Sequence, residues 1–226
     1  MSHPPLLTDV MRPVRHVLLD FDGPVCSVFS GLPATEVARR LLDSVRAAGE
    51  LPHEWVSETD PLALLRRIDE ERPELAADAD GVLSRLEEEA AGLARPTPGG
   101  EPFLRACVAS GRFVWIVSNN SAGAIRTYLQ AHGLDAYVAG VFGRIPGDPS
   151  AMKPNPRLLL DAMDAASAKP GECVFLGDAV RDVQAGDLAG VPTIGYANKP
   201  GKDVALAQAG AVVVVDSMRA VADALG

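Results

Sequence analysis

Two acidic side chains stand together where the first apolar segment of the chain ends. The segment 16–20 finishes in Asp20, and Asp22 follows two residues later, beside Gly23, which permits a sharp turn. On its own this pair is a weak indication of function, because acids at strand ends also cap helices or face solvent. Its meaning depends on the side chains that the fold brings beside it.

Further polar side chains follow the later apolar segments or lie between them. They are a hydroxyl with an adjacent amide, a lysine and two more acids: Ser118, Asn119, Lys153, Asp178 and Asp182. Taken alone, Ser118 would be an ordinary helix cap, Lys153 a surface lysine and Asp182 a residue that favours the start of a helix. Their joint occurrence, in this order, is far less expected by chance.

Short apolar segments that alternate with amphipathic ones predict the elements that position these side chains. The apolar segments are rich in Val, Ile, Leu and Phe and lack strict alternation, which is typical of strands buried on both faces of a parallel sheet. Six such strands are expected, at residues 16–20, 113–117, 137–142, 173–177, 192–196 and 211–215. The pattern predicts an α/β fold with a doubly wound parallel sheet, in which the polar groups meet at the carboxyl ends of the strands.

Cap and stop residues mark several of the intervening helices. Ser121 can cap a helix that Gly133 ends, and Asn155, which precedes a proline, begins another. A third helix is expected over residues 180–189, before Gly190. These signals place a helix after three of the predicted strands.

The stretch between about residues 30 and 95 shows no strand pattern. It shows three helical patterns instead, around residues 37–45, 60–68 and 83–93. The second begins at Asp60, which precedes a proline. A connection of this length is too long for a simple crossover between strands. We therefore expect an α/β core domain formed by residues 1–29 and 97–226, and an inserted all-helical cap domain at residues 30–96.

Three acids, a hydroxyl and an ammonium group meet at one edge of the predicted sheet. This combination indicates that the site binds both a cation and an anion. Asp20, Asp22 and Asp178 would repel one another and have raised pKa values without a cation. A hard divalent ion resolves this repulsion, and Mg²⁺ commonly binds one or two carboxylates, waters and a phosphate. Ser118, backbone N–H groups and Lys153 then suit the oxygens of a phosphoryl group.

Composition narrows the classes of partner and compartment. The 226 residues carry 21 Lys and Arg against 30 Asp and Glu, a net charge of −9, which argues against a nucleic-acid partner. The most apolar runs are far shorter than the roughly 20 residues that span a bilayer, and the first residues show no signal peptide. We expect a soluble, cytoplasmic protein without a membrane partner, present as a monomer or homodimer.

Cysteine, histidine and tryptophan residues offer no second site. Cys26, Cys107 and Cys173 are too scattered for a disulfide framework or a zinc site, and we expect them to be small buried side chains. The four histidines show no ligand spacing. Trp55 lies between predicted cap helices, where it could touch a substrate, but packing within the cap is the favoured interpretation.

Four motifs in this order resemble those of the haloacid dehalogenase (HAD) superfamily, in particular its phosphatase-like branch with a helical (C1-type) cap inserted after the first motif. They read DFDGPV at 20–25, VSNN at 117–120, MKPNP around Lys153, and GDAVRD at 177–182. The resemblance covers nearly the whole chain and implies a Rossmann-like core. It implies a Mg²⁺-dependent phosphatase that hydrolyses a small phosphorylated metabolite.

The resemblance also implies roles for the acids. Asp20 would be the nucleophile that forms an aspartyl-phosphate intermediate. Asp22 would protonate the leaving oxygen and then deprotonate the water that hydrolyses the intermediate. Mg²⁺ would be held by the carboxylates of Asp20 and Asp178 and by the backbone carbonyl of Asp22.

The remaining motif residues would bind and orient the phosphoryl group. Ser118, Asn119 and Gly23 are implied to bind phosphoryl oxygens. Lys153 would balance the charge of the nucleophile and the phosphate. Asp182 would orient Lys153 or a metal-bound water.

Pro24 departs from the family pattern, which usually has Thr or Ser at that position. Proline has neither a hydroxyl nor an N–H group. Either the positioning that the hydroxyl side chain of the family provides is lost here, or the proline ring simply stiffens the turn.

Three alternatives to the phosphatase stay open. The first is a phosphomutase of the same fold. The second is a C–halogen hydrolase, but Asp22, the second acid of the first motif, argues against it. The third is a catalytically idle binding protein, which only Pro24 supports.

Overall fold

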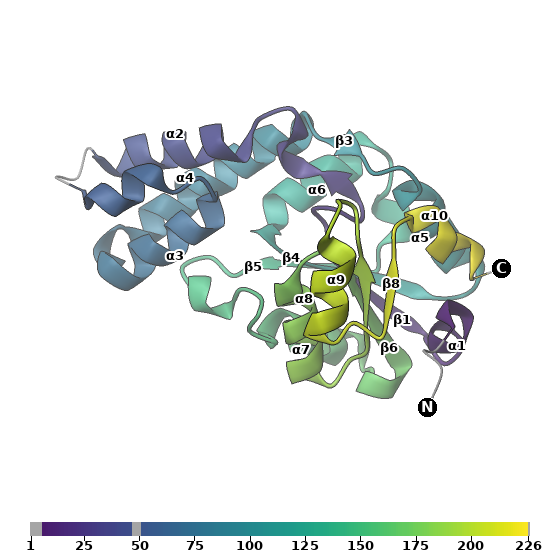
Figure 1. Cartoon of the computed structure of the whole chain (residues 1–226). Coiled ribbons are helices and arrows are strands. Elements are labelled where there is room, and N and C mark those ends of the chain that lie inside the picture. Colours follow the sequence, from purple (N-terminus) through teal and green to yellow (C-terminus); the bar gives the residue numbers. More distant parts are fainter. Residues whose placement is uncertain (1–5, 47–50, 226) are drawn as a thin grey trace.

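A six-stranded parallel sheet forms the centre of the molecule. The computed structural model describes residues 6–46 and 51–225, and the strands of the sheet follow the order β5-β4-β1-β6-β7-β8 (Figure 1). Their bounds are β1 His16–Leu19, β4 Phe113–Ser121, β5 Gly140–Arg144, β6 Cys173–Gly177, β7 Thr193–Tyr196 and β8 Val213–Val215. Every pair in this sheet is parallel. The predicted α/β fold with a doubly wound parallel sheet is confirmed.

β6 has the predicted bounds, β1, β7 and β8 are shorter than predicted by one or two residues, and β4 and β5 differ more. β5 begins at Gly140 rather than at residue 137, because Asp135–Tyr137 forms a 3₁₀ turn (η3). β4 continues past Val117 through the polar residues to Ser121, and its pairing with β5 shifts register over that stretch. The polar residues expected in a loop therefore lie on the extended end of a strand.

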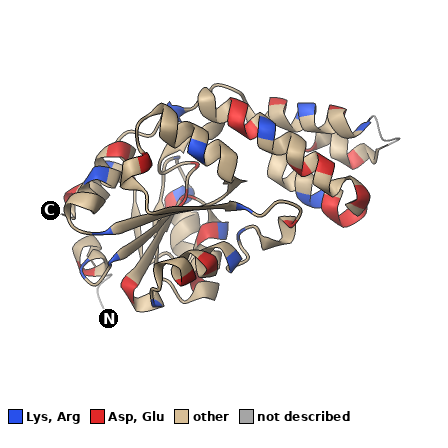
Figure 2. Ribbon diagram, turned by 180° about the vertical axis from the view of Figure 1, so that it is seen from behind, with Lys and Arg blue, Asp and Glu red and all other residues tan. Residues whose placement is uncertain are grey.

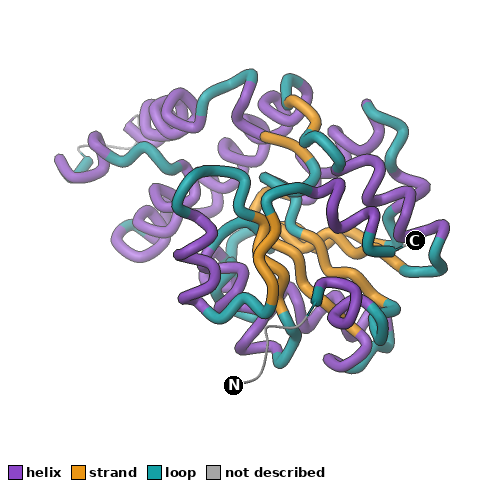
Figure 3. The backbone as a smooth tube through the Cα atoms, turned by 45° about the vertical axis from the view of Figure 1, so that its right-hand side comes forward, coloured by secondary structure: helices purple, strands orange, loops and turns teal. Residues whose placement is uncertain are grey.

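Helices cover both faces of the sheet (Figure 3). One layer contains α1 Leu7–Met11, α5 Gly100–Ala109, α6 Ala122–Ala131 and α10 Met218–Asp223; the other contains α7 Arg157–Ala166, α8 Val180–Ala189 and α9 Lys202–Ala209. Within β1, Val17 and Leu19 pack under the first layer and Leu18 under the second. A strand that is buried on both faces needs apolar residues at every position, and this explains its pattern.

A group of helices stands beside the sheet, in the stretch between β2 and β3. It contains η1 Val28–Ser30, α2 Ala34–Arg46, η2 His53–Ser57, α3 Pro61–Glu71 and α4 Pro73–Gly92. Residues such as Leu41, Leu65 and Leu83 form its own apolar cluster. All three expected helices are present. The third, expected to extend to residue 93, ends at Gly92, and Leu93 is 55% exposed.

A short two-stranded ribbon closes this helical segment at its base. β2 Cys26–Ser27 pairs antiparallel with β3 Arg95–Pro96. The sequence patterns do not predict the ribbon, since strands of two residues carry no periodicity. The ribbon brings the two ends of the helical segment side by side, next to the first motif.

Helix α4 packs on two different cores. Its residues Ala79 and Leu83 belong to the apolar cluster of the helical segment. Its later residues Ala90 and Ala91 belong to the cluster under the α5–α6 layer of the sheet, and α4 runs along α6. The single helix thus connects the two parts of the molecule through continuous packing.

The predicted helix boundaries agree with the hydrogen bonds at the helix ends. The side chains of Asp60, Ser121 and Asn155 each accept a hydrogen bond from a backbone N–H two or three residues further on, at 2.9, 3.2 and 3.0 Å. After α8, Gly190 has φ +69°, a conformation that glycine adopts at little cost.

Lys, Arg, Asp and Glu are interspersed over the helices (Figure 2). None of the helices in residues 6–46 and 51–225 has the length and hydropathy that a bilayer crossing requires. All three cysteines are free thiols and buried, as expected.

Candidate active site

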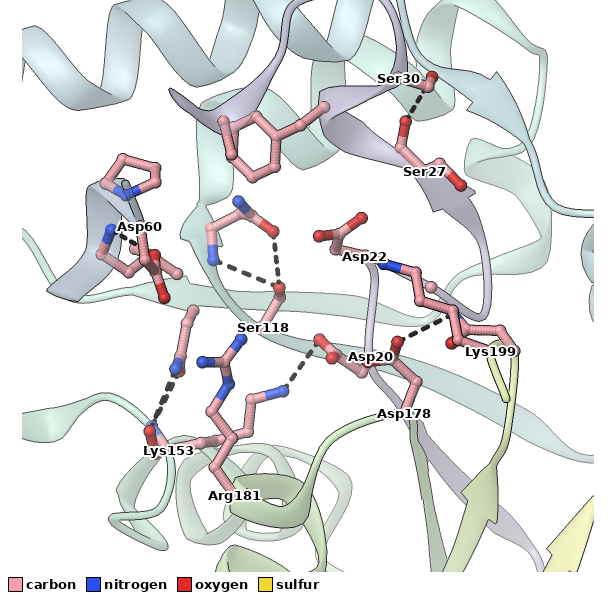
Figure 4. Close-up of a pocket in the computed structure, with 18 of the residues that line it drawn as sticks. Asp20, Asp22, Ser27, Ser30, Asp60, Ser118, Lys153, Asp178, Arg181 and Lys199 are labelled. Atoms are coloured by element: carbon pink, nitrogen blue, oxygen red, sulfur yellow. Dashed lines mark hydrogen bonds and ion pairs between the residues drawn. The ribbon is translucent and has the colours of Figure 1, made fainter. Parts of the chain in front are cut away.

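A cavity of about 480 Å³ lies where β1, β4 and β6 end and the helical segment begins. Figure 4 shows charged side chains that line this cavity, among them those of Asp20, Lys153 and Asp178. The sheet brings together seven of the eight predicted site residues in its wall: Asp20, Asp22, Gly23, Ser118, Asn119, Lys153 and Asp178. The eighth, Asp182, is fully buried beneath it.

Lys153 forms the floor of the cavity and is almost fully buried. Its Nζ lies 2.9 Å from Oδ1 of Asp20 and 2.8 Å from Oδ1 of Asp182, and it donates to the carbonyl of Val117 at 3.1 Å. The amine is therefore held between two carboxylates. Burial lowers the pKa of Lys153, but Asp182 and Asp20 outweigh it and raise the pKa above its usual value.

Asp20 occupies the first position after β1. Its Oδ1 also accepts a hydrogen bond from the N–H of Phe21 at 2.8 Å. Burial raises the pKa of Asp20 to about 7; Lys153 works against this shift, and Asp182 and Asp178 add to it. A carboxylate this poorly solvated needs a cation beside it to stay ionised.

Asp22 faces the same cavity in a different environment. Its Oδ1 accepts a hydrogen bond from the N–H of Val28 in η1, at 2.9 Å. Burial raises the pKa of Asp22, the Val28 N–H lowers it in part, and Asp178 raises it further. The side chain can therefore hold a proton more readily than an ordinary aspartate can.

Asp178 and Gly23 lie in direct contact. A Cβ atom at position 23 would stand 2.6 Å from Cγ of Asp178, and Gly23 has φ +108°. Glycine is required there for both reasons. Oδ2 of Asp178 accepts from Lys202 Nζ and, at 2.9 Å, from Asn198 Nδ2.

The acids of the site fit a divalent cation. Oxygen atoms of Asp20, Asp178 and Asp182 lie within 4.8 Å of one another, and oxygen donors of this kind suit Mg²⁺. Both oxygens of Asp182 are engaged, because Oδ1 pairs with Lys153 and Oδ2 accepts from the N–H groups of Asp178 and Ala179 at 3.0 and 2.9 Å. The contacts of Asp20 and Asp178 described above involve only Oδ1 of Asp20 and Oδ2 of Asp178, so each has a second oxygen with capacity for a cation.

The end of β4 forms the opposite wall. Oγ of Ser118 accepts a hydrogen bond from the N–H of Asn120 at 3.3 Å. The Asn119 amide holds the backbone of Lys153 at both ends, since its Nδ2 donates to the carbonyl at 3.1 Å and its Oδ1 accepts from the N–H at 2.8 Å. Asn119 thus positions the lysine, a role that the motif alone does not reveal.

Thr97 supports the turn of the first motif. Its hydroxyl donates to the carbonyl of Gly23 at 2.5 Å, and its N–H donates to the carbonyl of Val25 at 3.0 Å. Both contacts flank Pro24, which has no hydroxyl of its own. Sequence reasoning missed Thr97 because it lies far along the chain from the first motif, directly after β3.

The helical segment supplies the roof of the cavity through Phe29, Ala34 and the residues 59–62. Arg66 of α3 donates to the carbonyl of Lys153 at 2.7 Å, so the roof touches the floor. Trp55 does not line the cavity. It is fully buried in the helical cluster and donates to Glu71 at 3.0 Å, as the packing interpretation predicted.

Two cations at the cavity wall were not predicted as site residues. Arg181, at the start of α8, points into the cavity, and Lys199 lies at its edge (Figure 4). Among the described residues, neither side chain has an acidic partner within 4.0 Å. The signal that could have found them is their place a few residues after β6 and β7, at the carboxyl edge of the sheet.

Comparisons with known proteins find relatives along most of the chain. The family model described as haloacid dehalogenase-like hydrolase matches residues 14–190. A phosphoglycolate phosphatase of Xylella fastidiosa is 31% identical over 188 residues, 80% of this chain and 79% of that protein. One from Salmonella typhimurium is 26% identical over 245 residues, 96% of this chain and 95% of that protein. A crystal structure described as a predicted phosphatase from Clostridium acetobutylicum has the same fold, with a TM-score of 0.73 and 18% identity over 93% of this chain and 97% of that one.

Proposed function

The chain belongs to the haloacid dehalogenase-like hydrolases and is a phosphatase, and we propose that its substrate is a small phosphorylated carboxylic acid. The observation that carries the proposal is the distribution of cations in the cavity. Lys153 is neutralised by acids at the floor, whereas Arg181 and Lys199 line the wall without an acidic partner among the described residues. The relatives named phosphoglycolate phosphatases support a substrate with both a phosphate and a carboxylate.

In the proposed first step, a carboxylate oxygen of Asp20 attacks phosphorus and the bond to the leaving oxygen breaks. Lys153 holds the Asp20 carboxylate in place during the attack, through the 2.9 Å ion pair. Asp22 donates its proton to the departing alkoxide. Its raised pKa supports this role, because a larger fraction of the group is protonated at neutral pH.

In the proposed second step, Asp22 acts in the reverse direction. Its carboxylate takes a proton from a water molecule, the water oxygen attacks phosphorus, and the bond to Asp20 breaks. Inorganic phosphate is released and Asp20 is restored. The proton that Asp22 gave to the alcohol is thus replaced by one from water, and the enzyme returns to its starting state.

The walls of the cavity are proposed to hold the phosphoryl group. Ser118 and the N–H group of Asn119 would bind its oxygens. The N–H of Gly23 already donates to the carbonyl of Cys26 at 2.7 Å, so Gly23 would act by leaving room for Asp178 rather than by donating to the phosphoryl group. Asp20, Asp178 and the backbone carbonyl of Asp22 would hold Mg²⁺, which would supply positive charge to the phosphoryl oxygens.

We propose that the helical segment is a cap domain, comprising residues 30–96, on a core of residues 1–29 and 97–226. Its separate apolar cluster supports this division, and the residues 59–62 that it places over the cavity support a role in covering the substrate. A cavity of about 480 Å³ suits a small metabolite.

The test is release of inorganic phosphate from matched substrates. Phosphoglycolate and ethyl phosphate have the same two-carbon frame, and only the first carries a carboxylate. We expect the protein to prefer phosphoglycolate, to lose activity in EDTA and to recover it with Mg²⁺. Arg181→Gln should reduce the preference by about 10- to 100-fold, which corresponds to a hydrogen bond between charged groups. Equal rates on both substrates would contradict the substrate class, and substrate consumption without phosphate release would indicate a mutase instead.

A further inference from the structure

Three charged side chains outside the cavity form a buried cluster. Arg144, the last residue of β5, lies with its Nε 2.6 Å from Oδ1 of Asp80 and its Nη1 2.9 and 3.0 Å from the two carboxylate oxygens of Glu87. Their side chains are between 0 and 5% exposed. Asp80 and Glu87 both belong to α4, so the cluster joins this helix to the end of the sheet. None of the three residues lines the cavity.

The cluster holds three consecutive residues at the end of β4. Glu87 accepts from the N–H of Ser121 at 2.9 Å and from the Asn120 side chain at 3.2 Å. Nη1 of Arg144 donates to the carbonyl of Asn119 at 3.0 Å. The segment that follows Ser118 is therefore bound from one side by buried charges.

One peptide group connects the cluster to the cavity. Arg144 binds the carbonyl of the peptide between Asn119 and Asn120, and Ser118 Oγ accepts from the N–H of that same peptide. The orientation of this peptide plane determines where the Ser118 hydroxyl lies. Through the same segment it also affects Asn119, whose amide holds Lys153.

Stability alone is a poor explanation for such a cluster. It places two carboxylates and one guanidinium out of water, and well-packed apolar side chains of similar size commonly serve the fold equally well. What the charges provide is direction, because each hydrogen bond fixes one backbone group of the segment 119–121. The position of that segment matters for function where it contacts a ligand.

We propose that Arg144 and Glu87, supported by Asp80, are positioning residues for the phosphate-binding segment 118–121. They act through the backbone and make no contact with the substrate. The inference rests on the proposed function, in which Ser118 and Asn119 bind the phosphoryl group. It also ties that group to helix α4, which carries the helical segment, so the placement of the roof and of the phosphate site depend on one cluster.

The test compares two substitutions on the same helix. Glu87→Gln keeps the shape of the side chain and removes its charge within the cluster. Glu89→Gln makes the same change two residues away, where the partner is Arg40 in an exposed pair. We expect Glu87→Gln to weaken binding of inorganic phosphate in the presence of Mg²⁺, and to lower kcat/KM, by about 10- to 100-fold, as misplacement of binding groups does. Glu89→Gln should match the parent protein in both measurements.

A second variant and a second readout separate positioning from loss of stability. Arg144→Lys keeps a cation but cannot bind Glu87, Asp80 and the Asn119 carbonyl together, and it serves if Glu87→Gln does not fold. Leu83→Ala in α4 should lower the melting temperature without changing phosphate affinity while the protein is folded. Amide exchange at Ser121, measured by NMR, should speed up in Glu87→Gln and not in Leu83→Ala.

The outcomes are distinguishable. If Glu87→Gln and Arg144→Lys lower the melting temperature but bind phosphate as the parent does, the cluster is structural and the inference is overturned. If the parent protein itself neither binds nor releases phosphate, the proposed function fails first and this inference fails with it. Weakened phosphate binding with faster exchange at Ser121 supports it.

Discussion

Asp20 and Asp22 have the same carboxylate side chain and are two residues apart in the sequence, but their contacts differ. Asp20 is paired with the buried ammonium of Lys153, whereas Asp22 accepts one hydrogen bond from the N–H of Val28 and has no paired cation within 4.0 Å among the described residues. Even with Lys153 beside it, the pKa of Asp20 is raised to about 7, so we expect the further positive charge of a bound Mg²⁺ to keep it ionised for attack on phosphorus. A buried carboxylate without a paired cation is suited to carry a proton.

We expect substitutions of the two acids to have different effects. Asp20→Asn should abolish turnover, because an amide cannot form the acyl phosphate. Asp22→Asn should slow the first step by about 10²–10⁴-fold for an alkyl phosphate, the usual contribution of general acid catalysis. For p-nitrophenyl phosphate, whose leaving group needs little protonation, the first step should slow less. Single-turnover release of the alcohol or of p-nitrophenolate measures the first step, and steady-state phosphate release measures the complete cycle.

An intermediate should also become visible. In Asp22→Asn the hydrolysis of phospho-Asp20 lacks its base, so the intermediate should accumulate with p-nitrophenyl phosphate and appear as an adduct of about 80 Da in the mass spectrum of the quenched protein. Parental rates of Asp22→Asn on both substrates would show that the acid–base assignment is wrong.

At this scale the sequence predicted the motif side chains but not most of their partners. Asp20, Ser118, Lys153 and Asp178 could be found because each follows a recognisable strand or belongs to a motif. Their partners carry no such signal: Thr97, Asn198, Lys202, Arg144 and Glu87 are ordinary polar residues in the sequence, and only the folded chain shows that they bind a motif residue or its backbone.

Among the elements, prediction succeeded where a capping residue and a long apolar pattern coincide. Ser121 predicts the start of α6, and Gly190 predicts the C-terminal end of α8. Four helices were not predicted: α1, α5, α9 and α10. α1, α9 and α10 have between five and eight residues, and a pattern this short is hard to separate from a loop. α5 is as long as α6 and α8, but Gly99, which precedes it, offers no capping side chain. For α10 a signal was present, since Ser217 directly precedes it.

The Ser217 cap should contribute measurably to stability. Its Oγ accepts from the N–H of Arg219 at 3.2 Å at the start of α10, which packs under the sheet through Met218 and Val221. We expect Ser217→Ala to lower the free energy of unfolding by about 1 kcal/mol in a urea titration. Arg219→Ala is the control: it removes an exposed pair with Asp223 and keeps the capped N–H, so little change is expected. Equal losses in the two variants would contradict the cap.

Across the whole molecule, the alternation of strands and helices was sufficient to predict the sheet and the three helices between its first two strands, but not how these helices attach. The structure shows a two-stranded ribbon at their base and a helix, α4, that packs on both parts of the molecule. These attachments depend on contacts between residues far apart in the sequence, which periodicity does not contain.

The attachments of the roof differ in strength from one helix to another. α3 reaches the floor of the cavity through one hydrogen bond, from Arg66 to the carbonyl of Lys153, and packs beside it on η4 Pro149–Ala151 and on Met152. The later part of α4 is held by the buried charges of Glu87 and by the packing of Ala90 and Ala91 on the core. Substrate entry must separate roof from floor, and the attachment of α3, which has no buried ion pair within the described part of the chain, is the easier one to break. We therefore expect the roof to move by way of α3 and the loop before it, with the end of α4 fixed.

Hydrogen exchange followed by mass spectrometry measures this difference directly. Without ligand, amides in residues 59–71 should exchange faster than those in residues 84–92, because the roof opens transiently while the buried end of α4 stays packed. Adding Mg²⁺ with inorganic phosphate should slow exchange in 59–71, since a ligand in the cavity favours the closed roof, and should leave 84–92 nearly unchanged. Arg66→Ala should reduce the ligand-dependent protection of 59–71, because it removes the hydrogen bond that closes the roof, whereas Arg67→Ala on the same helix should not. If residues 84–92 gained as much protection as 59–71, the whole helical segment would move as one body about its linkers, and the fixed role of α4 would be wrong.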